Sequence, residues 1–249
     1  MADQKGTQVE SFLSDNCPPM GIYETLYAFR DSFGSFMGTE GTQPGSQGCP
    51  LTTPLEKFGG PPLPASVDVT WEDRFYPKAW GHPALREAIV DYYNSRYGST
   101  ITPENVMIFA GGRPGIYTVK AFLKEQVQVS IGNIEWPAYL DIMEQTNTTY
   151  HIVPFTKENN FHPSNASYYD RTGLDPDTCM MPVISNPQNP SGQTRSGEEL
   201  RELIEMAEQP GNGILLDEAY EMFPSPSVSG IEFVQDLAHS TALLQGARQ

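Results

Sequence analysis

Two short apolar runs, separated by one helix-sized segment, constrain the fold of this chain most. The first run covers residues 180–184 and leads into a loop with two Asn-Pro steps, and the second covers residues 213–216 and ends in Asp217. Such runs are typical of buried parallel strands that a crossover helix connects. The strands then end at the same edge of a sheet, where ligands of open parallel sheets bind. We therefore expect a binding site where these two runs end.

The same alternation of apolar runs and helix-like segments extends over residues 83–220. It predicts an α/β fold, a three-layer αβα sandwich with a mostly parallel sheet. The strands that we expect are residues 105–110, 127–131, 150–155, 180–184 and 213–216. The helices that we expect lie near residues 21–36, 83–96, 116–123, 140–146, 196–208 and 231–244.

Local signals indicate one helix start and one long connection. Ser196 is followed three residues later by Glu199, a spacing that predicts a capping box at a helix start. Residues 157–178 are polar and contain proline and glycine, so we expect a hairpin or a long loop there.

Size and composition bound the domain organisation. A chain of 249 residues with 38% hydrophobic content suffices for one large domain with a core, with or without an arm. Residues 38–67 are rich in glycine and proline, which favours an extended arm or lid and, with equal weight, a floppy tail. We therefore expect an N-terminal arm at residues 1–67 and a partial α/β domain at residues 68–249.

The net charge of −16 argues against nucleic acid and anionic membrane surfaces as partners. No run of 18 apolar residues occurs and the N-terminus is polar, so we expect a cytoplasmic protein. The four histidines and three cysteines show no metal-ligand spacing, and we expect neither a metal site nor a disulfide.

Two motifs point to a known family. The segments Asn189-Pro190-Ser191-Gly192 and Asp217-Glu218-Ala219-Tyr220 closely resemble the N-P-[ST]-G and D-x-A-Y motifs of class I/II aminotransferases. These are fold-type I enzymes that depend on pyridoxal 5′-phosphate. Residues 76–89 are similar to the Y-x-x-x-x-G-x-x-x-L-R-x-A-I segment of the same family. The motifs occur in the family's order, and the resemblance covers roughly residues 76–220.

The resemblance implies contacts to the cofactor ring. Asp217 would face the protonated pyridine nitrogen, because a carboxylate that ends a buried strand needs a cationic partner. Tyr220 and Asn189 would donate hydrogen bonds to the ring oxygen, and Trp136 would lie on the ring face. The alternatives are structural: an aspartate that caps a turn or pairs with an arginine, a core tyrosine, a turn asparagine and a core tryptophan.

The resemblance also implies how the phosphate is bound. Gly111, Gly112 and Arg113 follow an apolar run and precede a helix, an arrangement that directs free amides at an anion. Glycines in such a place are otherwise often only a turn. Tyr76 resembles the tyrosine that reaches the phosphate of the neighbouring subunit, which implies a homodimer; a surface aromatic is the alternative.

The sequence departs from the family pattern after Tyr220. The family's Schiff-base lysine lies downstream of D-x-A-Y, whereas the last lysine here is Lys157. We therefore assign no catalytic residue in this chain, no small C-terminal domain and no transamination by the chain alone. We interpret the chain as part of a longer aminotransferase that acts on an amino acid and a 2-oxo acid. The alternatives are a non-catalytic cofactor-binding or partner module, and a lyase, cyclase or oxidase of the same fold.

Overall fold

The computed structural model describes residues 22–36, 39, 41, 66, 68–76, 78–234 and 241–244. The chain divides into two units, Met1–Gly48 and Cys49–Gln249. In the first unit, helix α1 (Ile22–Phe33) confirms the helix predicted near residues 21–36. Of the predicted arm at residues 1–67, the structure describes residues 22–36, 39, 41 and 66, and the boundary at residue 67 stays a prediction.

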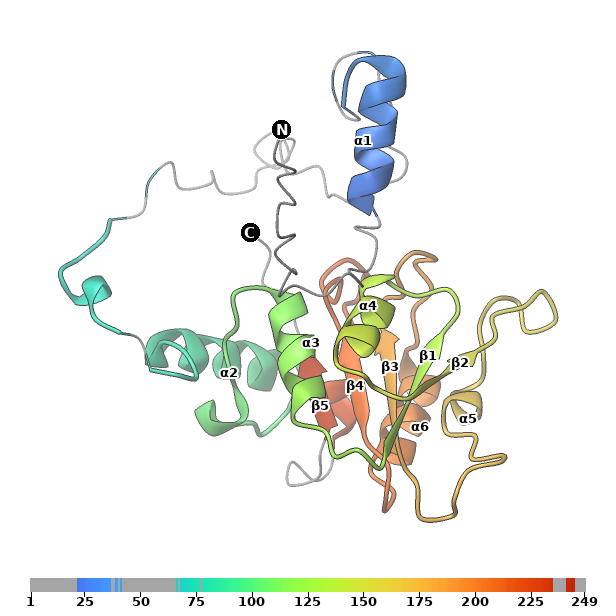
Figure 1. The fold of residues 1–249 in the computed structure, drawn as a ribbon. Coiled ribbons are helices and arrows are strands. Elements are labelled where there is room, and N and C mark those ends of the chain that lie inside the picture. Colours follow the sequence, from blue (N-terminus) through green and yellow to red (C-terminus); the bar gives the residue numbers. More distant parts are fainter. Residues whose placement is uncertain are drawn as a thin grey trace, which may run out of the picture. The chain divides into compact units, whose positions relative to one another are not determined.

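A parallel sheet forms the centre of the second unit, with the strand order β2-β1-β3-β4-β5 (Figure 1). Every neighbouring pair is parallel, which confirms the predicted sheet type. Four of its strands were predicted, and the fifth was not. The strands are β1 (Val127–Gly132), β2 (Tyr150–Val153), β3 (Cys179–Ser185), β4 (Ile214–Asp217) and β5 (Thr241–Leu244).

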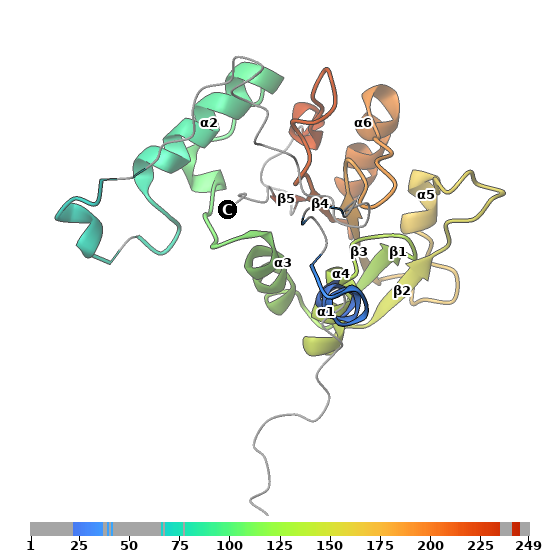
Figure 2. The same ribbon diagram turned by 90° about the horizontal axis from the view of Figure 1, so that it is seen from above.

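Helices cover both faces of this sheet, as Figure 2 shows. One face carries α3 (Gly112–Ala121) and α4 (Ala138–Gln145), whose apolar side chains pack on β1, β3 and β4. The other face carries α5 (Asn165–Tyr168) and α6 (Gly197–Ala207). This arrangement confirms the predicted three-layer αβα sandwich.

Successive side chains of β3 and β4 pack alternately on the two faces of the sheet. Val183 and Leu215 pack with α3 and α4, whereas Ile184 and Leu216 pack with α6. Successive side chains of a strand point to opposite faces, so both strands supply two apolar layers at once. The burial of each such side chain contributes roughly 1.5–3 kcal/mol to folding. By the same alternation, Asp217 lies on the α3/α4 side.

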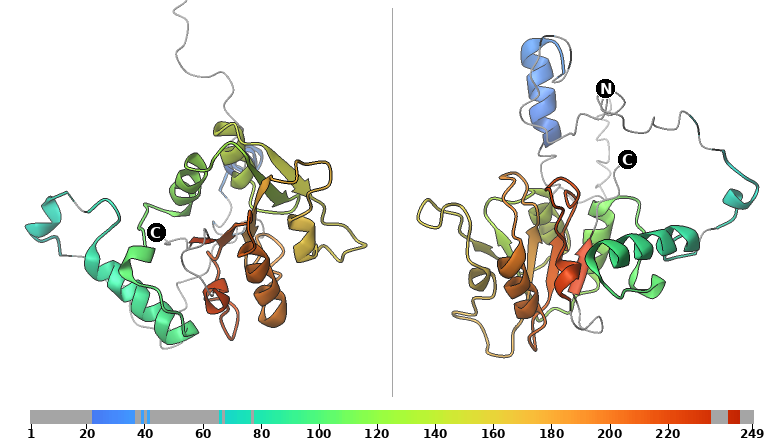
Figure 3. Two further views of the ribbon diagram at one scale, coloured as in Figure 1. Left: turned by 90° about the horizontal axis from the view of Figure 1, so that it is seen from below. Right: turned by 180° about the vertical axis from the view of Figure 1, so that it is seen from behind.

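Helix α2 (Pro83–Tyr97) confirms the helix predicted at residues 83–96. Proline at its first position needs no amide partner, and Gly98 ends it in the left-handed conformation, with φ of 68°. The helix lies beside the short 3₁₀ helix η4 (Gly230–Phe233) (Figure 3). Tyr93 of α2 and Ile231 of η4 share a small apolar cluster.

The predicted strand at residues 105–110 is wrong. The segment pairs with no strand, and the 3₁₀ helix η3 (Pro103–Asn105) begins just before it. The Val106 carbonyl accepts a hydrogen bond from Arg86 Nε at 2.9 Å, and the Ile108 amide donates to the Trp80 carbonyl at 3.0 Å. Two backbone groups of this apolar segment thus pair with Arg86 of α2 and with Trp80 of the preceding loop, and the segment is no strand of the sheet.

The predicted helix at residues 231–244 is also wrong. The segment contains η4 and then β5, which pairs with β4 in parallel register. The edge of β4 offers backbone hydrogen bonds to β5, a segment that lies far from it in the sequence. This tertiary pairing overrides the local helix propensity of residues 241–244. Helix α3 ends earlier than predicted, so that Phe122 lies just beyond it and is exposed.

The start of α6 was predicted correctly, but for the wrong local reason. The Ser196 side chain makes no capping hydrogen bond. Glu199 instead lies 2.5 Å from His162 Nε2 and 3.5 Å from Arg195 Nε. His162 belongs to the long loop expected at residues 157–178, which contains the short helix α5. Contacts from that loop replace the predicted capping box.

Candidate functional site

The carboxyl ends of β3 and β4 lie side by side, as the two apolar runs predicted. Ser185 and Asp217 are register partners, and the Asn186 amide donates to the Asp217 carbonyl at 2.9 Å. The loop after β3 then turns back, because the Asn189 amide donates to Ser185 Oγ at 2.9 Å. These hydrogen bonds hold the loop that contains both Asn-Pro steps directly beside Asp217, the acid that ends β4.

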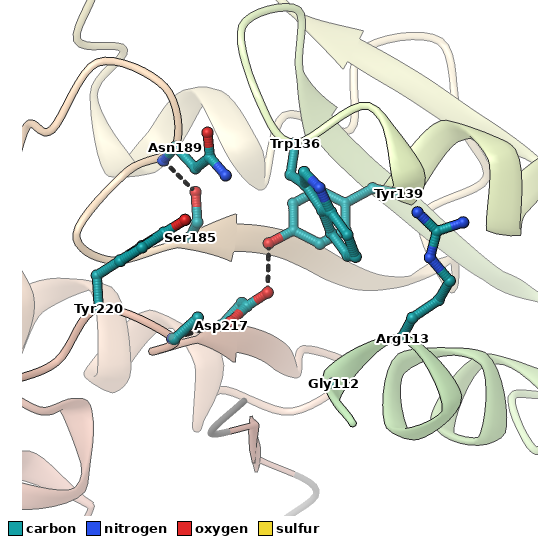
Figure 4. Close-up of a pocket in the computed structure, with 9 residues that line it drawn as sticks. Gly112, Arg113, Trp136, Tyr139, Ser185, Asn189, Asp217 and Tyr220 are labelled. Atoms are coloured by element: carbon teal, nitrogen blue, oxygen red, sulfur yellow. Dashed lines mark hydrogen bonds between the residues drawn. The ribbon is translucent and has the colours of Figure 1, made fainter. Parts of the chain in front are cut away.

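A pocket of about 230 Å³ opens at this edge of the sheet (Figure 4). Its lining comes from the start of α3, the start of α4, and the segments that follow β3 and β4. The lining residues are Gly112, Arg113, Trp136, Tyr139, Ser185, Asn189, Asp217, Ala219 and Tyr220.

Asp217 accepts two hydrogen bonds at the floor of the pocket. Tyr139 donates to Oδ2 at 2.8 Å, and the Ala219 amide donates to Oδ1 at 3.0 Å. Burial raises the pKa of Asp217, and both hydrogen bonds oppose that shift. Among the described residues, no lysine or arginine forms an ion pair with this carboxylate. A cation that enters the pocket would find a partner here.

Aromatic side chains and one arginine form another wall. The rings of Trp136 and Tyr139 meet edge to face, with centroids 5.4 Å apart. The Arg113 guanidinium lies 5.1 Å from the centroid of Trp136, within the range of a cation–π contact. Figure 4 shows this wall opposite Tyr220. A flat aromatic ligand and an anionic group are both compatible with these side chains.

The start of α3 offers backbone amides at the pocket. Its N-cap, Gly111, has φ of 108°, which a residue with a Cβ rarely adopts. Gly112 and Arg113 follow in the first turn, where amides have no intrahelical acceptor. Pro114 has no amide, so the first two positions carry the donors that can meet an anion.

The structure thus brings together most residues that the sequence singled out. Six of them line the pocket: Gly112, Arg113, Trp136, Asn189, Asp217 and Tyr220. Gly111 lies next to it as the N-cap of α3. Tyr76 does not line it and is fully exposed in this chain. The cofactor contacts of all eight residues stay predictions.

Sequence reasoning missed three lining residues of the pocket, Tyr139, Ser185 and Ala219. Tyr139 lies three residues after Trp136 in W-P-A-Y, and an aromatic pair at this spacing on a helix start shares one face. This signal was available. Ser185 carried no such signal, because only the strand register places it beside Asp217.

The fold is that of an α/β protein with a pocket at the carboxyl edge of a parallel sheet. The sequence profile of aminotransferase class I and II matches residues 70–246. The chain therefore belongs to the class I and II aminotransferase family, as its two motifs predicted.

Individual relatives agree with this assignment. The chain is 33% identical over 159 residues to an aspartate aminotransferase of Pyrococcus horikoshii, across 64% of this chain and 39% of that protein. It is 27% identical over 148 residues to the transaminase BacF of Bacillus subtilis, across 57% of this chain and 36% of BacF. A substrate-bound BacF structure matches with a TM-score of 0.61 at 25% identity, over 72% of this chain and 45% of that chain. The chain spans about two fifths of the length of these curated relatives.

None of the helices in the described residues has the length and apolar character that a bilayer crossing requires. Within the same residues, no three histidine, cysteine, aspartate or glutamate side chains converge as metal ligands.

Proposed function

We propose that this chain forms the cofactor-binding part of a pyridoxal-phosphate-dependent aminotransferase. The reaction would transfer an amino group between an amino acid and a 2-oxo acid. One observation carries the proposal: a carboxylate that pairs with no cation of the described part of the chain, an indole, two polar side chains and a helix N-terminus converge on one pocket. Membership of the class I and II aminotransferase family supports it.

The residues of the pocket fit the chemistry of the cofactor. The Asp217 carboxylate accepts hydrogen bonds from Tyr139 and from the Ala219 amide. Burial still disfavours its charged form, and a cation that pairs with the carboxylate would offset this effect. A protonated pyridine nitrogen is such a cation. The paired amides of Gly112 and Arg113 suit the phosphate, because anions bind at helix N-termini. The net charge of −16 makes such local donors necessary.

When bound, pyridoxal phosphate supplies an electron-accepting ring that stabilises negative charge developing on the substrate carbon. Asp217 holds the proton on the ring nitrogen by ion pairing. Tyr139 orients Asp217 and stabilises its charged form, because it donates to the carboxylate. Electron withdrawal by the ring depends on this proton, so Asp217 is the side chain with the largest role.

The other residues position the ring. Tyr220 and Asn189 would donate hydrogen bonds to the ring oxygen, and Trp136 would cover the ring and exclude water. In a homodimer, Tyr76 would reach the phosphate in the neighbouring subunit. Its full exposure in the single chain is compatible with that role.

Among the residues that the structure describes, no lysine lines the pocket. We therefore expect the chain to bind the cofactor non-covalently and to carry out no transamination by itself. Treatment with borohydride should leave the cofactor removable by dialysis. A reduced covalent adduct on a lysine of this chain would contradict this expectation.

The decisive experiment is a titration of the purified chain with pyridoxal phosphate, followed by quenching of tryptophan fluorescence. Asp217→Asn should weaken binding about tenfold or more, since it removes a charge-assisted contact. Asp91→Asn is the matched control, because Asp91 is exposed on α2 and lies outside the pocket. Equal affinity of the two variants would overturn the proposal.

A further inference from the structure

Glu135 is a buried acid directly before Trp136, and it does not line the pocket. Its side chain is 8% exposed, and burial raises the pKa of its carboxyl group to about 8. Oε2 lies 2.5 Å from Ser185 Oγ, whereas Oε1 is buried with no hydrogen-bond partner among the described residues. A carboxylate in such a place would leave one charged oxygen unsatisfied, which is costly.

Close packing keeps this carboxyl group away from solvent. A Cβ added at Gly132 would lie 3.2 Å from Cγ of Glu135 and 2.2 Å from the ring of Phe155. The end of β1 therefore needs glycine so that both side chains fit. Glu135 has little freedom to move out and find water.

Ser185 connects Glu135 to the pocket. Its hydroxyl accepts a hydrogen bond from the Asn189 amide and contacts both Glu135 and Tyr139. Tyr139 in turn donates to Asp217 at 2.8 Å. Glu135 and Tyr139 thus both adjoin Ser185, and hydrogen bonds are formed at the two ends of this series, between Glu135 and Ser185 and between Tyr139 and Asp217.

The charges around Glu135 decide its protonation state. The titratable and charged groups that face it are Asp217 from β4, Tyr139 from α4, Tyr168 from α5 and Arg195 from the loop before α6. The Arg195 side chain donates to Asn165 and to a backbone carbonyl, and it forms no ion pair with Glu135. Arg195 favours the charged form of Glu135, but among the described residues no cation forms an ion pair with Glu135 or Asp217, so these two buried acids do not both ionise readily.

We propose that Glu135 is a positioning residue whose neutral carboxyl donates to Ser185, so that the donors Glu135, Ser185 and Tyr139 all point toward a charged Asp217. This inference rests on the proposed function, because it concerns the acid that would hold the cofactor ring. When Glu135 donates to Ser185, the Ser185 hydroxyl proton is directed at the Tyr139 oxygen. The Tyr139 proton then strengthens its bond to Asp217, because aligned hydrogen bonds polarise one another.

Ionisation of Glu135 reverses the first link. The carboxylate accepts the Ser185 proton, so that Tyr139 loses a donor and a second negative charge appears near Asp217. Asp217 then holds its proton more strongly, and its ion pair with a ring cation weakens. The affinity for the cofactor should accordingly fall as the pH rises through the pKa of Glu135.

The test compares the wild-type chain with Glu135→Gln and Glu135→Ala. The amide of Gln donates to Ser185 at every pH, so Glu135→Gln should bind pyridoxal phosphate within about twofold of wild type near neutral pH. Wild type should lose about tenfold in affinity between about pH 7 and about pH 9, and Glu135→Gln should not. Glu135→Ala should bind weakly at all pH values. The same decline with pH in wild type and Glu135→Gln would overturn the inference.

A second readout needs no cofactor. The carboxyl carbon of Asp217 can be titrated by NMR in the three proteins, and its pKa should be higher in Glu135→Ala than in Glu135→Gln. An Asp217 titration that is unaltered in Glu135→Ala overturns the inference, whether or not the cofactor binds. If Asp217 responds but wild type binds no cofactor, the hydrogen-bonded chain stands and the proposed function fails.

Discussion

Asp217 and Glu218 are consecutive acids at the end of one strand, and they have opposite surroundings. Both have a pKa that burial raises, to about 7 for Glu218. Asp217 faces the pocket, where no cation among the described residues pairs with it. Glu218 is 1% exposed on the other side of the sheet, where it accepts from Ser229 Oγ at 2.6 Å and from the Gly230 amide at 2.7 Å.

The difference shows that burial and a shifted pKa do not identify a functional acid. Glu218 has both properties, yet its hydrogen bonds attach η4 to β4 and leave no room for a ligand. A Cβ at Gly230 would already lie 2.8 Å from the side chain of Leu216. Asp217 is distinguished by the open volume in front of it. The predictions that follow separate a structural acid from a binding acid.

The largest effect is expected for Glu218→Ala. The substitution leaves the Ser229 hydroxyl and the Gly230 amide buried without an acceptor, so it should lower the free energy of unfolding by about 2–5 kcal/mol. Urea denaturation followed by circular dichroism measures this change. Asp217→Ala should cost much less, because water can enter the pocket and replace the lost contacts. An equal decrease in the free energy of unfolding in both variants would contradict the distinction between a structural acid and a binding acid.

The stability of the chain should also depend on pH. The pKa of Glu218 is raised in the folded state, so the unfolded chain releases this proton first and stability falls as the pH rises from about 4.5 to about 7. Glu218→Gln should remove this part of the decline, about 3 kcal/mol at most. Glu135 adds a similar decline that extends to about pH 8 and remains in this variant. Thermal melting at several pH values tests the difference, and a profile unchanged by Glu218→Gln would contradict it.

A smaller effect, confined to binding, is expected for Tyr139→Phe. The substitution removes the donor to Asp217 and should weaken pyridoxal phosphate binding about tenfold, the equivalent of about 1.4 kcal/mol. The loss should grow as the pH falls, since Asp217 without this donor takes up a proton more readily. Fluorescence titration at two pH values measures it. A loss of stability as large as that of Glu218→Ala would place Tyr139 among the structural contacts instead.

The smallest effect is expected for Arg113→Gln. This variant loses the cation–π contact with Trp136 and one positive charge near the helix start, so binding should weaken about two- to fivefold. Raising the salt concentration should reduce the difference from wild type. Arg201→Gln is the control, because Arg201 lies on α6 and outside the pocket. An identical response of both variants would remove Arg113 from the site.

Strand ends were predictable because burial leaves a clear mark in the sequence. The run at residues 213–216 had to be an inner strand, so Asp217 had to lie at its edge, and the same reasoning placed the loop that contains Asn189. Helix α2 was predictable from its spacing and from Pro83. In each of these cases the informative residues are neighbours in the sequence.

Contacts between distant segments were not predictable in this way. Residues 105–110 have the composition of a strand, but Arg86 and Trp80 take up part of the backbone that a strand would pair. The contact of Glu135 with Ser185 joins residues 50 positions apart. Such contacts depend on how the strands and helices are arranged in the folded chain, and no pattern of neighbouring residues indicates them.

The ladder between β3 and β4 decides which acid meets a ligand. Ser185 is opposite Asp217 in a short run of paired residues. Sliding β4 by a single position would turn every side chain to the other face, so that Glu218 would enter the cavity and Asp217 would disappear beneath η4. Deleting one apolar residue within β4 should therefore bring Glu218 to the place of Asp217 and Asp217 to the place of Leu216, while the net charge stays the same. Spacing along this strand is accordingly under tighter constraint than the identity of its apolar residues.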